Sequence, residues 1–403
     1  MNPWPPASGK PFTRVRHLAA LWTGRSVLHN VNVLFRAGRV EWVGPGGSDI
    51  CPDDCDEFDG SGLIGMPGLF DCHTHAIWAG TRLGDFVRRL GGESYASLLE
   101  GGGGIHTTVH ATAAASDADL HAHLAARLAT MLDRGVTTVE IKSGYGLTIE
   151  AEARLLRIAR SVASPQRRVT TFLGAHAIPP DRSRADYVDE VCGPMLAACA
   201  PFADAIDVYC DRGAFTLAEA ERILLAGKSA GLAVKVHAEQ VEFTGAAAMA
   251  ARLGALSCDH LERIDDAGIA AMAASGSVAV LLPGAMLYLR DPPPPVAKLR
   301  AAGVPLAVAT DFNPGSSPVS DLWTCATLAC LTMGLTPEEA LAGITSVAAR
   351  ALGCEGGVIE PGSPADLAIF APPPGEIPDP RVLVQYMGGH EAKAVWIGGE
   401  RVR

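Results

Sequence analysis

The chain has 403 residues, 48% of them hydrophobic, so it can bury a large core and exceeds the usual size of one domain. Its formal net charge is -11 and no segment is rich in lysine or arginine, which argues against a nucleic acid or an anionic membrane as partner and leaves a small molecule as the expected ligand. No apolar stretch reaches the ~18 residues of a transmembrane helix, and residues 1–6 lack the apolar core of a signal peptide.

The two ends of the chain carry short alternating apolar segments, broken by glycine and proline, that are typical of small β structure. Residues 27–35 near the start and 362–370 near the end are examples. We expect residues 1–66 and 356–403 to pair into one composite β domain that flanks a central unit at 67–355.

Within the central unit, apolar runs alternate with Ala- and Leu-rich stretches, which is the pattern of parallel βα units. Helices are predicted at 117–134, 148–161 and 217–230. There are eight apolar runs, the number that a closed (β/α)8 TIM barrel requires. An open doubly wound sheet is the alternative, but no Gly-x-Gly-x-x-Gly follows the first run to support a dinucleotide site. The runs cover residues 69–75, 136–142, 169–176, 205–211, 233–237, 255–260, 278–282 and 306–311.

Two histidines stand one residue apart at the end of the first run. Residues i and i+2 of an extended strand face the same way, so His73 and His75 can both reach one metal ion. On a helix the same spacing would turn the rings apart by roughly 200°. Pro67 and Gly68 favour strand and turn over helix. Alone, a His-x-His pair is a weak sign and is more often two partly buried polar residues.

Several other runs also end in a side chain that can ligate or titrate. Barrel enzymes build their sites at the carboxyl ends of the strands, so His237 and Asp311 are expected to meet His73 and His75 at one rim. Singly, His237 or Asp311 is better explained as a hydrogen-bonded core residue. Together, three neutral imidazoles and one carboxylate suit one divalent ion such as zinc or iron(II) and leave one coordination position for water. The ion would lower the pKa of that water.

This arrangement resembles a known family. Metal ligands on the first, fifth and eighth strands beside a composite β domain are similar to the amidohydrolase superfamily, and local sequences within it resemble the imidazolonepropionase family. The resemblance implies a mononuclear metal site and hydrolysis of 4-imidazolone-5-propanoate to N-formimidoyl-L-glutamate in histidine degradation. Its most specific segment is Glu-Ile-Lys-Ser-Gly-Tyr-Gly-Leu at 140–147. The others are Asp-Cys-His-Thr-His at 71–75, Gly-Thr-Arg at 80–82, Gly-Gly-Gly-Gly-Ile at 101–105, Gly-Ala-His at 174–176, Val-His-Ala-Glu-Gln at 236–240, Asp-His-Leu-Glu at 259–262 and Thr-Asp-Phe-Asn-Pro-Gly-Ser at 310–316.

The propanoate of such a substrate needs a cation. Arg82, just past the histidine pair, offers a charge-assisted fork, although without the resemblance it would be read as a surface arginine in a loop. Tyr145 and His176 can hydrogen-bond the ring or the carboxylate. Polar and backbone groups close to the metal come from the segment after Asp311, where glycine permits close approach. The expected residues of that segment are Asn313, Gly315 and Ser316.

The resemblance also implies the catalytic groups. Asp311 is expected to accept the proton of the attacking water, and His260 to orient that water or polarise the oxygen that gains charge. Some relatives carry glutamate where this chain has Gln240, and glutamine cannot carry a proton at neutral pH. Either Glu239 takes part as the proton shuttle, which strand alternation from His237 permits, or Gln240 only hydrogen-bonds the substrate.

Three other features have simpler explanations. Lys142 could suggest a carbamylated lysine between two metal ions, but the family resemblance implies a mononuclear site. His121 and His123 lie in a predicted helix and point apart, so they are expected to be solvated. The glycines at 101–104 lack the Gly-Lys-Ser/Thr ending of a phosphate loop and are predicted to form a mobile loop over the pocket.

Two competing functions remain open at this point. One is another cyclic amidine or amide hydrolase or a nucleobase deaminase of the same superfamily, and Arg82 argues against it because a neutral base needs no cation. The other is a catalytically silent, metal-stabilised scaffold, and the complete set of proposed ligands argues against it.

The cellular context is predicted from the cysteines and the size. The ten cysteines are dispersed without paired Cys-x-x-Cys motifs, Cys51 and Cys55 being the nearest approach, and Cys72 is expected to pack in the core. Reduced thiols fit a cytoplasmic enzyme. A homodimer is possible for a barrel of this size.

Overall fold

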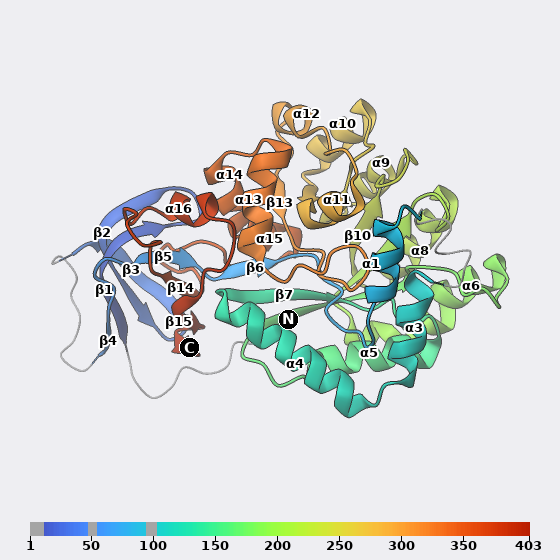
Figure 1. The fold of residues 1–403 in the computed structure, drawn as a ribbon, viewed down its shortest axis with the longest axis horizontal. Helices are drawn as coiled ribbons and strands as arrows, with labels where there is room; N and C mark the ends of the chain where they lie inside the picture. The colour runs from blue at the N-terminus through green and yellow to red at the C-terminus, as the bar shows by residue number, and fades with distance from the viewer. Residues whose placement is uncertain (1–11, 47–54, 94–102) are drawn as a thin grey trace.

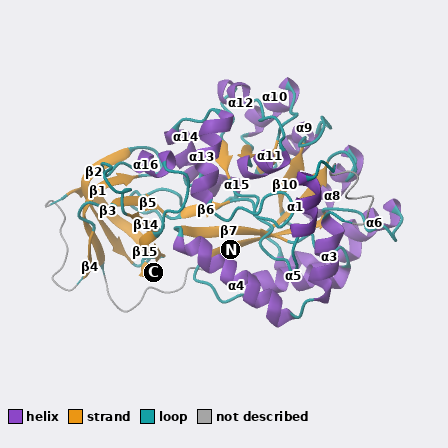
Figure 2. Cartoon of the chain, in the orientation of Figure 1, coloured by secondary structure: helices purple, strands orange, loops and turns teal. Residues whose placement is uncertain are grey.

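The computed structural model describes residues 12–46, 55–93 and 103–403, which form a β domain and a larger unit of helices around a parallel sheet (Figure 1). Helices, strands and loops are distinguished in Figure 2, where the strands of the β domain gather at one end of the molecule. The predicted (β/α)8 barrel with a composite β domain is confirmed. The expectations for residues 1–6, for Cys51 and for the first half of the 101–104 loop concern segments outside the described residues.

The β domain is one sheet made from both ends of the chain. Its strands are β1 (Thr13–Trp22), β2 (Val27–Arg36), β3 (Arg39–Pro45), β4 (Asp56–Asp59), β5 (Ile64–Pro67), β14 (Leu367–Phe370), β15 (Ala392–Ile397) and β16 (Glu400–Arg401). Their order is β16-β15-β14-β5-β1-β2-β3, with β4 paired to β1. The ends meet where β14 runs antiparallel to β5, with Ile369 opposite Gly65. The exact domain boundaries stay a prediction.

Eight parallel strands form the barrel, and each corresponds to one of the eight apolar runs. They are β6 (Leu69–Asp71), β7 (Val136–Lys142), β8 (Arg167–Ala175), β9 (Ala205–Cys210), β10 (Ala233–Ala238), β11 (Ser257–His260), β12 (Val278–Leu281) and β13 (Leu306–Val308). Neighbours in the sheet follow the order of the chain. The first and last strands approach each other beyond β6, where the peptide N–H of Asp311 donates to the carbonyl of His73 over 2.9 Å and Thr74 bridges Phe312.

Helices cover the outside of the barrel (Figure 1). The α-helices are α1 (Leu83–Leu90), α3 (Ile105–Ala114), α4 (Asp117–Asp133), α5 (Ile149–Ser161), α6 (Arg184–Glu190), α7 (Leu196–Cys199), α8 (Leu217–Ser229), α9 (Ala246–Arg252), α10 (Asp266–Ser275), α11 (Pro283–Leu289), α12 (Val296–Ala301), α13 (Leu322–Met333), α14 (Pro337–Gly343), α15 (Ser346–Ala351) and α16 (Pro380–Gln385), and the short turns are η1 (Val191–Met195) and η2 (Ala200–Phe202). The three helices predicted from the sequence are α4, α5 and α8. Each starts after a Ser or Thr (Ser116, Thr148 and Thr216) whose hydroxyl accepts a backbone N–H of the first turn. Among the described residues, no helix is long and apolar enough to cross a membrane.

Part of the inside of the barrel is charged, where such barrels usually hold branched aliphatic side chains. Every residue of β7 is buried, as expected for a strand covered on both faces. Val139 and Ile141 join the main apolar core together with Leu124 of α4. Their alternating neighbours Glu140 and Lys142 are fully buried ions in contact with each other.

Candidate active site

The four predicted metal ligands converge at the carboxyl rim of the barrel. The Nε2 atoms of His73 and His75 each lie 3.3 Å from Oδ1 of Asp311. His237 faces His75 with the two Nε2 atoms 3.4 Å apart. These side chains come from segments beyond β6, from β10 and from beyond β13, so the strand topology brings together residues that lie far apart in the sequence.

The donor atoms fit a divalent metal ion. Two overlapping sets each have their donor atoms within 4.8 Å of one another, one made of His73, His75 and Asp311 and the other of His73, His237 and His260. His260 therefore lies within reach of the cluster, although it was expected only as a catalytic group. His73 Nε2 is buried and has no hydrogen-bond partner, which would be costly unless another group occupies the space between the donors. Neutral imidazoles with one carboxylate are a donor set suited to zinc or iron(II).

The electrostatics keep most of these groups in the state that a metal ligand needs. Burial lowers the pKa of His75 to about 4 and that of His260 to about 3, so both imidazoles are neutral near pH 7. Burial alone would raise the pKa of Asp311, but the adjacent rings of His73 and His75 hold it well below its usual range. The pKa of His73 is raised: burial and Lys142 act to lower it, and the carboxylates of Asp259 and Asp311 outweigh them.

Two buried aspartates orient the imidazoles from behind. Asp259 Oδ2 accepts a hydrogen bond from Nδ1 of His73 over 2.6 Å, and Asp207 Oδ2 lies 3.0 Å from Nδ1 of His237. With Nδ1 directed to a carboxylate, Nε2 of each ring is left for the cluster. Sequence reasoning missed both roles. The available signal was an aspartate inside an apolar run, two residues before Tyr209 in one case and directly before His260 in the other.

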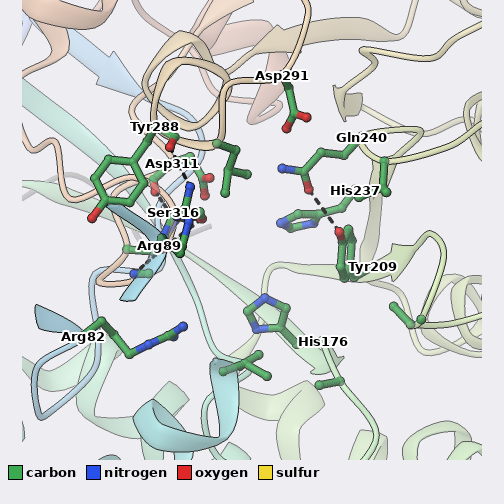
Figure 3. A pocket seen from close by; sticks show the side chains of 18 of the residues that line it. Arg82, Arg89, His176, Tyr209, His237, Gln240, Tyr288, Asp291, Asp311 and Ser316 are labelled. Carbon is green, nitrogen blue, oxygen red and sulfur yellow. Dashed lines mark hydrogen bonds between the residues drawn. The ribbon is translucent and has the colours of Figure 1, made fainter. Parts of the chain in front are cut away.

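A cavity of about 930 Å³ opens over the cluster (Figure 3). Its size is in the range of small-molecule sites. Most of the predicted substrate and metal residues line it, namely His75, Arg82, Tyr145, His176, His237, Gln240, His260, Asp311, Asn313, Gly315 and Ser316. His73 contributes to the donor cluster but does not line the cavity.

Arg82 is buried in the cavity wall and already has partners there. Its Nε donates to Oδ2 of Asp85 over 2.5 Å, and its Nη1 donates to Oγ1 of Thr108 over 3.3 Å. A Cβ added to Gly315 would lie 2.9 Å from Nη1 of Arg82. Glycine at this position therefore leaves room for the guanidinium beside the loop that follows Asp311.

The aromatic wall lies next to the donors. The ring of His176 stacks on His75 with centroids 4.9 Å apart, and Tyr145 lies 5.5 Å from His176. Nδ1 of His176 bonds the carbonyl of Gly144 over 3.0 Å, so Nδ1 carries the proton and Nε2 is an acceptor. Burial lowers the pKa of His176 well below its usual value, so this ring is neutral.

The polar groups after Asp311 are partly used within their own turn. Asn313 Oδ1 accepts the backbone N–H groups of Gly315 and Ser316, each over 2.8 Å. Its Nδ2 donates to the carbonyl of Asp311 over 2.7 Å. Asn313 therefore shapes the loop. The cavity also receives Gln240, whose Oε1 accepts from the hydroxyl of Tyr209 over 3.1 Å (Figure 3).

Glu239 is placed away from the cavity. Its φ of 59° breaks the strand alternation on which the prediction relied, so its side chain does not follow that of His237. Oε1 instead accepts the backbone N–H of Ala247 in the first turn of α9 over 3.3 Å, and Glu239 is not among the residues that line the cavity. Burial raises its pKa to about 7.

Several cavity residues were not predicted. Arg89, in α1, lies two helical turns after Arg82, the residue before that helix, a spacing that could have indicated a shared face. Its Nη2 donates to the carbonyl of Tyr288 over 2.7 Å, and its Nη1 is buried without a hydrogen-bond partner. The other unpredicted lining residues with charged or hydroxyl groups include Tyr209, Arg212, Tyr288, Arg290 and Asp291.

Comparison with known proteins finds relatives over most of the chain. Residues 81–403 match the model of the Amidohydrolase family. An imidazolonepropionase of Stenotrophomonas maltophilia is 45% identical over 95% of this chain and 97% of its own length, and one of Cereibacter sphaeroides is 50% identical over 88% of this chain and 91% of its own.

Solved structures show the same fold at low identity. N-isopropylammelide isopropylaminohydrolase from Burkholderia multivorans has a TM-score of 0.70 at 19% identity, with 97% of this chain and 98% of that chain covered. A mutant of the atrazine chlorohydrolase TrzN from Arthrobacter aurescens, complexed with zinc and atraton, has a TM-score of 0.69 at 18% identity over 97% of this chain and 95% of that chain.

Proposed function

Because the chain belongs to the amidohydrolase family and, within it, to the imidazolonepropionases, we propose that it opens the ring of 4-imidazolone-5-propanoate by hydrolysis and forms N-formimidoyl-L-glutamate. It is a hydrolase acting on a C–N bond. One observation carries the assignment of the site: the imidazoles of His75 and His237, the carboxylate of Asp311 and the guanidinium of Arg82 line one cavity. The shared cavity supports a site in which one substrate would meet both a metal ion and a cation for its propanoate.

His73, His75, His237 and Asp311 would hold one zinc or iron(II) ion. When bound, the ion would supply a water of lowered pKa and polarise the ring carbonyl. Support for a single ion comes from the overlap of the two donor sets at His73. Lys142, which as a carbamate could bridge two metal ions, instead contacts Glu140 and Asp207, with its Nζ 3.1 and 2.7 Å from their carboxylate oxygens.

The residues of the chain then divide the reaction between them. Arg82 anchors the propanoate, and Tyr145 and His176 bind the ring from the aromatic wall. The oxygen of water bonds to the ring carbonyl carbon, the ring C–N bond breaks, and one proton must pass from the water to the released nitrogen. Asp311, ionised because its pKa is held low, accepts that proton first. The neutral His260 donates a hydrogen bond to the oxygen on which charge develops.

Of the two alternatives for position 239–240, we favour substrate binding by Gln240. Its Oε1 is engaged by Tyr209, which leaves the amide nitrogen to donate into the cavity. The carboxylate of Glu239 lies at the first turn of α9 and does not need to move in this account.

We further propose a reducing, cytoplasmic setting, supported by the free thiols of all the cysteines in the described part of the chain. A homodimer is part of the same proposal and is tested by light scattering.

The experiment is turnover of synthetic 4-imidazolone-5-propanoate by the metal-loaded protein. Absorbance of the imidazolone should fall, mass spectrometry should find N-formimidoyl-L-glutamate, and no ammonium should be released. Release of ammonium would instead indicate a deaminase, and an inert but metal-loaded protein would indicate a scaffold. Asp311→Asn should abolish turnover. Asp321→Asn, at the N-cap of α13, is the matched control and should retain it.

A further inference from the structure

One charged group below the active site has no part in the reaction described above. Lys142, the last residue of β7, is fully buried inside the barrel. Its Nζ lies 2.7 Å from Asp207 Oδ2, 3.1 Å from Glu140 Oε1 and 3.7 Å from Asp259 Oδ2. These are the surroundings of an ammonium, because a carbamate there would place a fourth negative charge among three carboxylates.

Two of the contacted oxygens are those that orient the metal ligands. Asp207 Oδ2 is also the atom 3.0 Å from Nδ1 of His237, and Asp259 Oδ2 is the atom that accepts from Nδ1 of His73 over 2.6 Å. The ammonium of Lys142 therefore lies behind the imidazoles of His73 and His237, which are far apart in the sequence. Each aspartate bridges Lys142 to one ring.

The second buried lysine cannot replace this contact. Lys235 donates to Glu140 Oε2 over 2.8 Å and to the carbonyl of Cys72 over 2.9 Å. Without Lys142, three buried carboxylates would share one ammonium that binds only one of them directly. An uncompensated buried charge is strongly unfavourable, so an aspartate would take up a proton or move toward another donor. Either change alters the group that faces Nδ1.

The network is not explained by stability alone. Buried ion pairs are often no better for stability than apolar side chains of the same volume, and most barrels of this type fill the space with aliphatic residues. The buried charges are explained by the metal ligands at the rim directly above them. Carboxylates behind ligand histidines fix the orientation of the rings and raise the basicity of the ligand nitrogens.

We propose that Lys142 is a positioning residue: through Asp207 and Asp259 it fixes the rings of His237 and His73 and thereby sets how tightly the protein holds its metal ion. The inference rests on the proposed function, because it presupposes a metal ion at this cluster.

The test measures zinc binding by the metal-free protein in competition with a chromophoric chelator. Lys142→Met keeps an unbranched side chain, one atom shorter, and removes the charge. Its Kd for zinc should be weaker by about tenfold or more, the loss typical when groups behind metal ligands are removed. The thermal unfolding midpoint of the metal-free variant should be lower, because buried carboxylates lose their ammonium, so the zinc Kd is measured well below that midpoint, where the protein is folded. Lys142→Gln is uncharged but keeps an amide NH2 that can donate hydrogen bonds. Its zinc Kd should lie between those of the wild type and Lys142→Met, and it serves if the methionine variant does not fold.

Thr171→Val is the matched control. Thr171 is fully buried in the same network, and its hydroxyl donates to Glu140 Oε1 over 2.6 Å. Its zinc Kd should equal that of the wild type within error. The proposal is overturned if Lys142→Met binds zinc as tightly as the wild type, or if the control loses as much affinity. Failure of the wild type itself to bind a metal ion at the cluster would overturn the proposed function as well, so the two failures are distinct.

Discussion

Removing the guanidinium of Arg82 is predicted to weaken recognition of the propanoate. A hydrogen bond to a charged group contributes ~1.5–3 kcal/mol, and ~1.4 kcal/mol is a factor of ten. Arg82→Met should therefore lower kcat/KM by about 10- to 150-fold, mainly through KM. Arg82→Lys, which keeps the charge and loses the forked guanidinium, should have a kcat/KM between those of Arg82→Met and the wild type.

The neighbour of Arg82 has to be included in this experiment. Arg82→Met leaves the carboxylate of Asp85 without its 2.5 Å partner, and that charge would repel the propanoate. The double variant Arg82→Met with Asp85→Asn removes the repulsion and isolates the lost attraction. Arg88→Met, also on α1 but exposed and paired with Glu93, is the matched control and should behave as the wild type.

The assay is the steady-state loss of imidazolone absorbance, with the natural substrate and with its propanamide analogue. The neutral analogue should be turned over with the same low efficiency by the wild type and by Arg82→Met. An unchanged kcat/KM for the propanoate in Arg82→Met, or an equal loss for both substrates, would refute the anchoring role.

Three further predictions concern the metal site, the cavity wall and Glu239. The pKa of His73 in the metal-free protein is raised above its ordinary 6.5, so protons compete with the metal ion for His73 up to and above that pH. Zinc binding should therefore weaken steadily as the pH falls from 8 to 6. A zinc Kd that does not change with pH would contradict this. Gly315→Ala places a Cβ 2.9 Å from Nη1 of Arg82 and should raise KM several-fold with little change in kcat, whereas an unaffected KM would remove Gly315 from the wall that holds Arg82. Burial raises the pKa of Glu239 from 4.5 to about 7, so the wild type loses stability as the pH rises through that range. Glu239→Gln should therefore be more thermally stable than the wild type at pH 8 but not at pH 4. Near-normal turnover by the same variant would exclude Glu239 as the proton shuttle.

The fold could be predicted because its signals are local. Each barrel strand is a short apolar run, and the number of runs and their alternation with helices define the architecture without any knowledge of contacts. The same regularity placed His73, His75, His237 and Asp311 at one rim. Their spacing in the sequence carries no such information, and only the strand topology relates them.

The sequence prediction placed Glu239 beside His237 because it assumed regular strand geometry. Glu239 and His260 both adopt a positive φ at or just beyond the end of a strand, so alternation from the preceding residue no longer gives the direction of the side chain. Positive φ values at non-glycine residues persist only where the surroundings hold them, which is a property of the folded site. The roles of Asp207 and Asp259 could not be predicted from the sequence for a related reason, since they depend on contacts across the barrel.

The central claim is that three imidazoles and one carboxylate hold one metal ion. Anomalous diffraction from crystals of the active protein, collected on both sides of the zinc and iron absorption edges, tests it most directly. The account predicts a single anomalous peak bounded by Nε2 of His73, His75 and His237 and by Oδ1 of Asp311. Fully active protein with no peak there, or with its metal ion elsewhere, would contradict it.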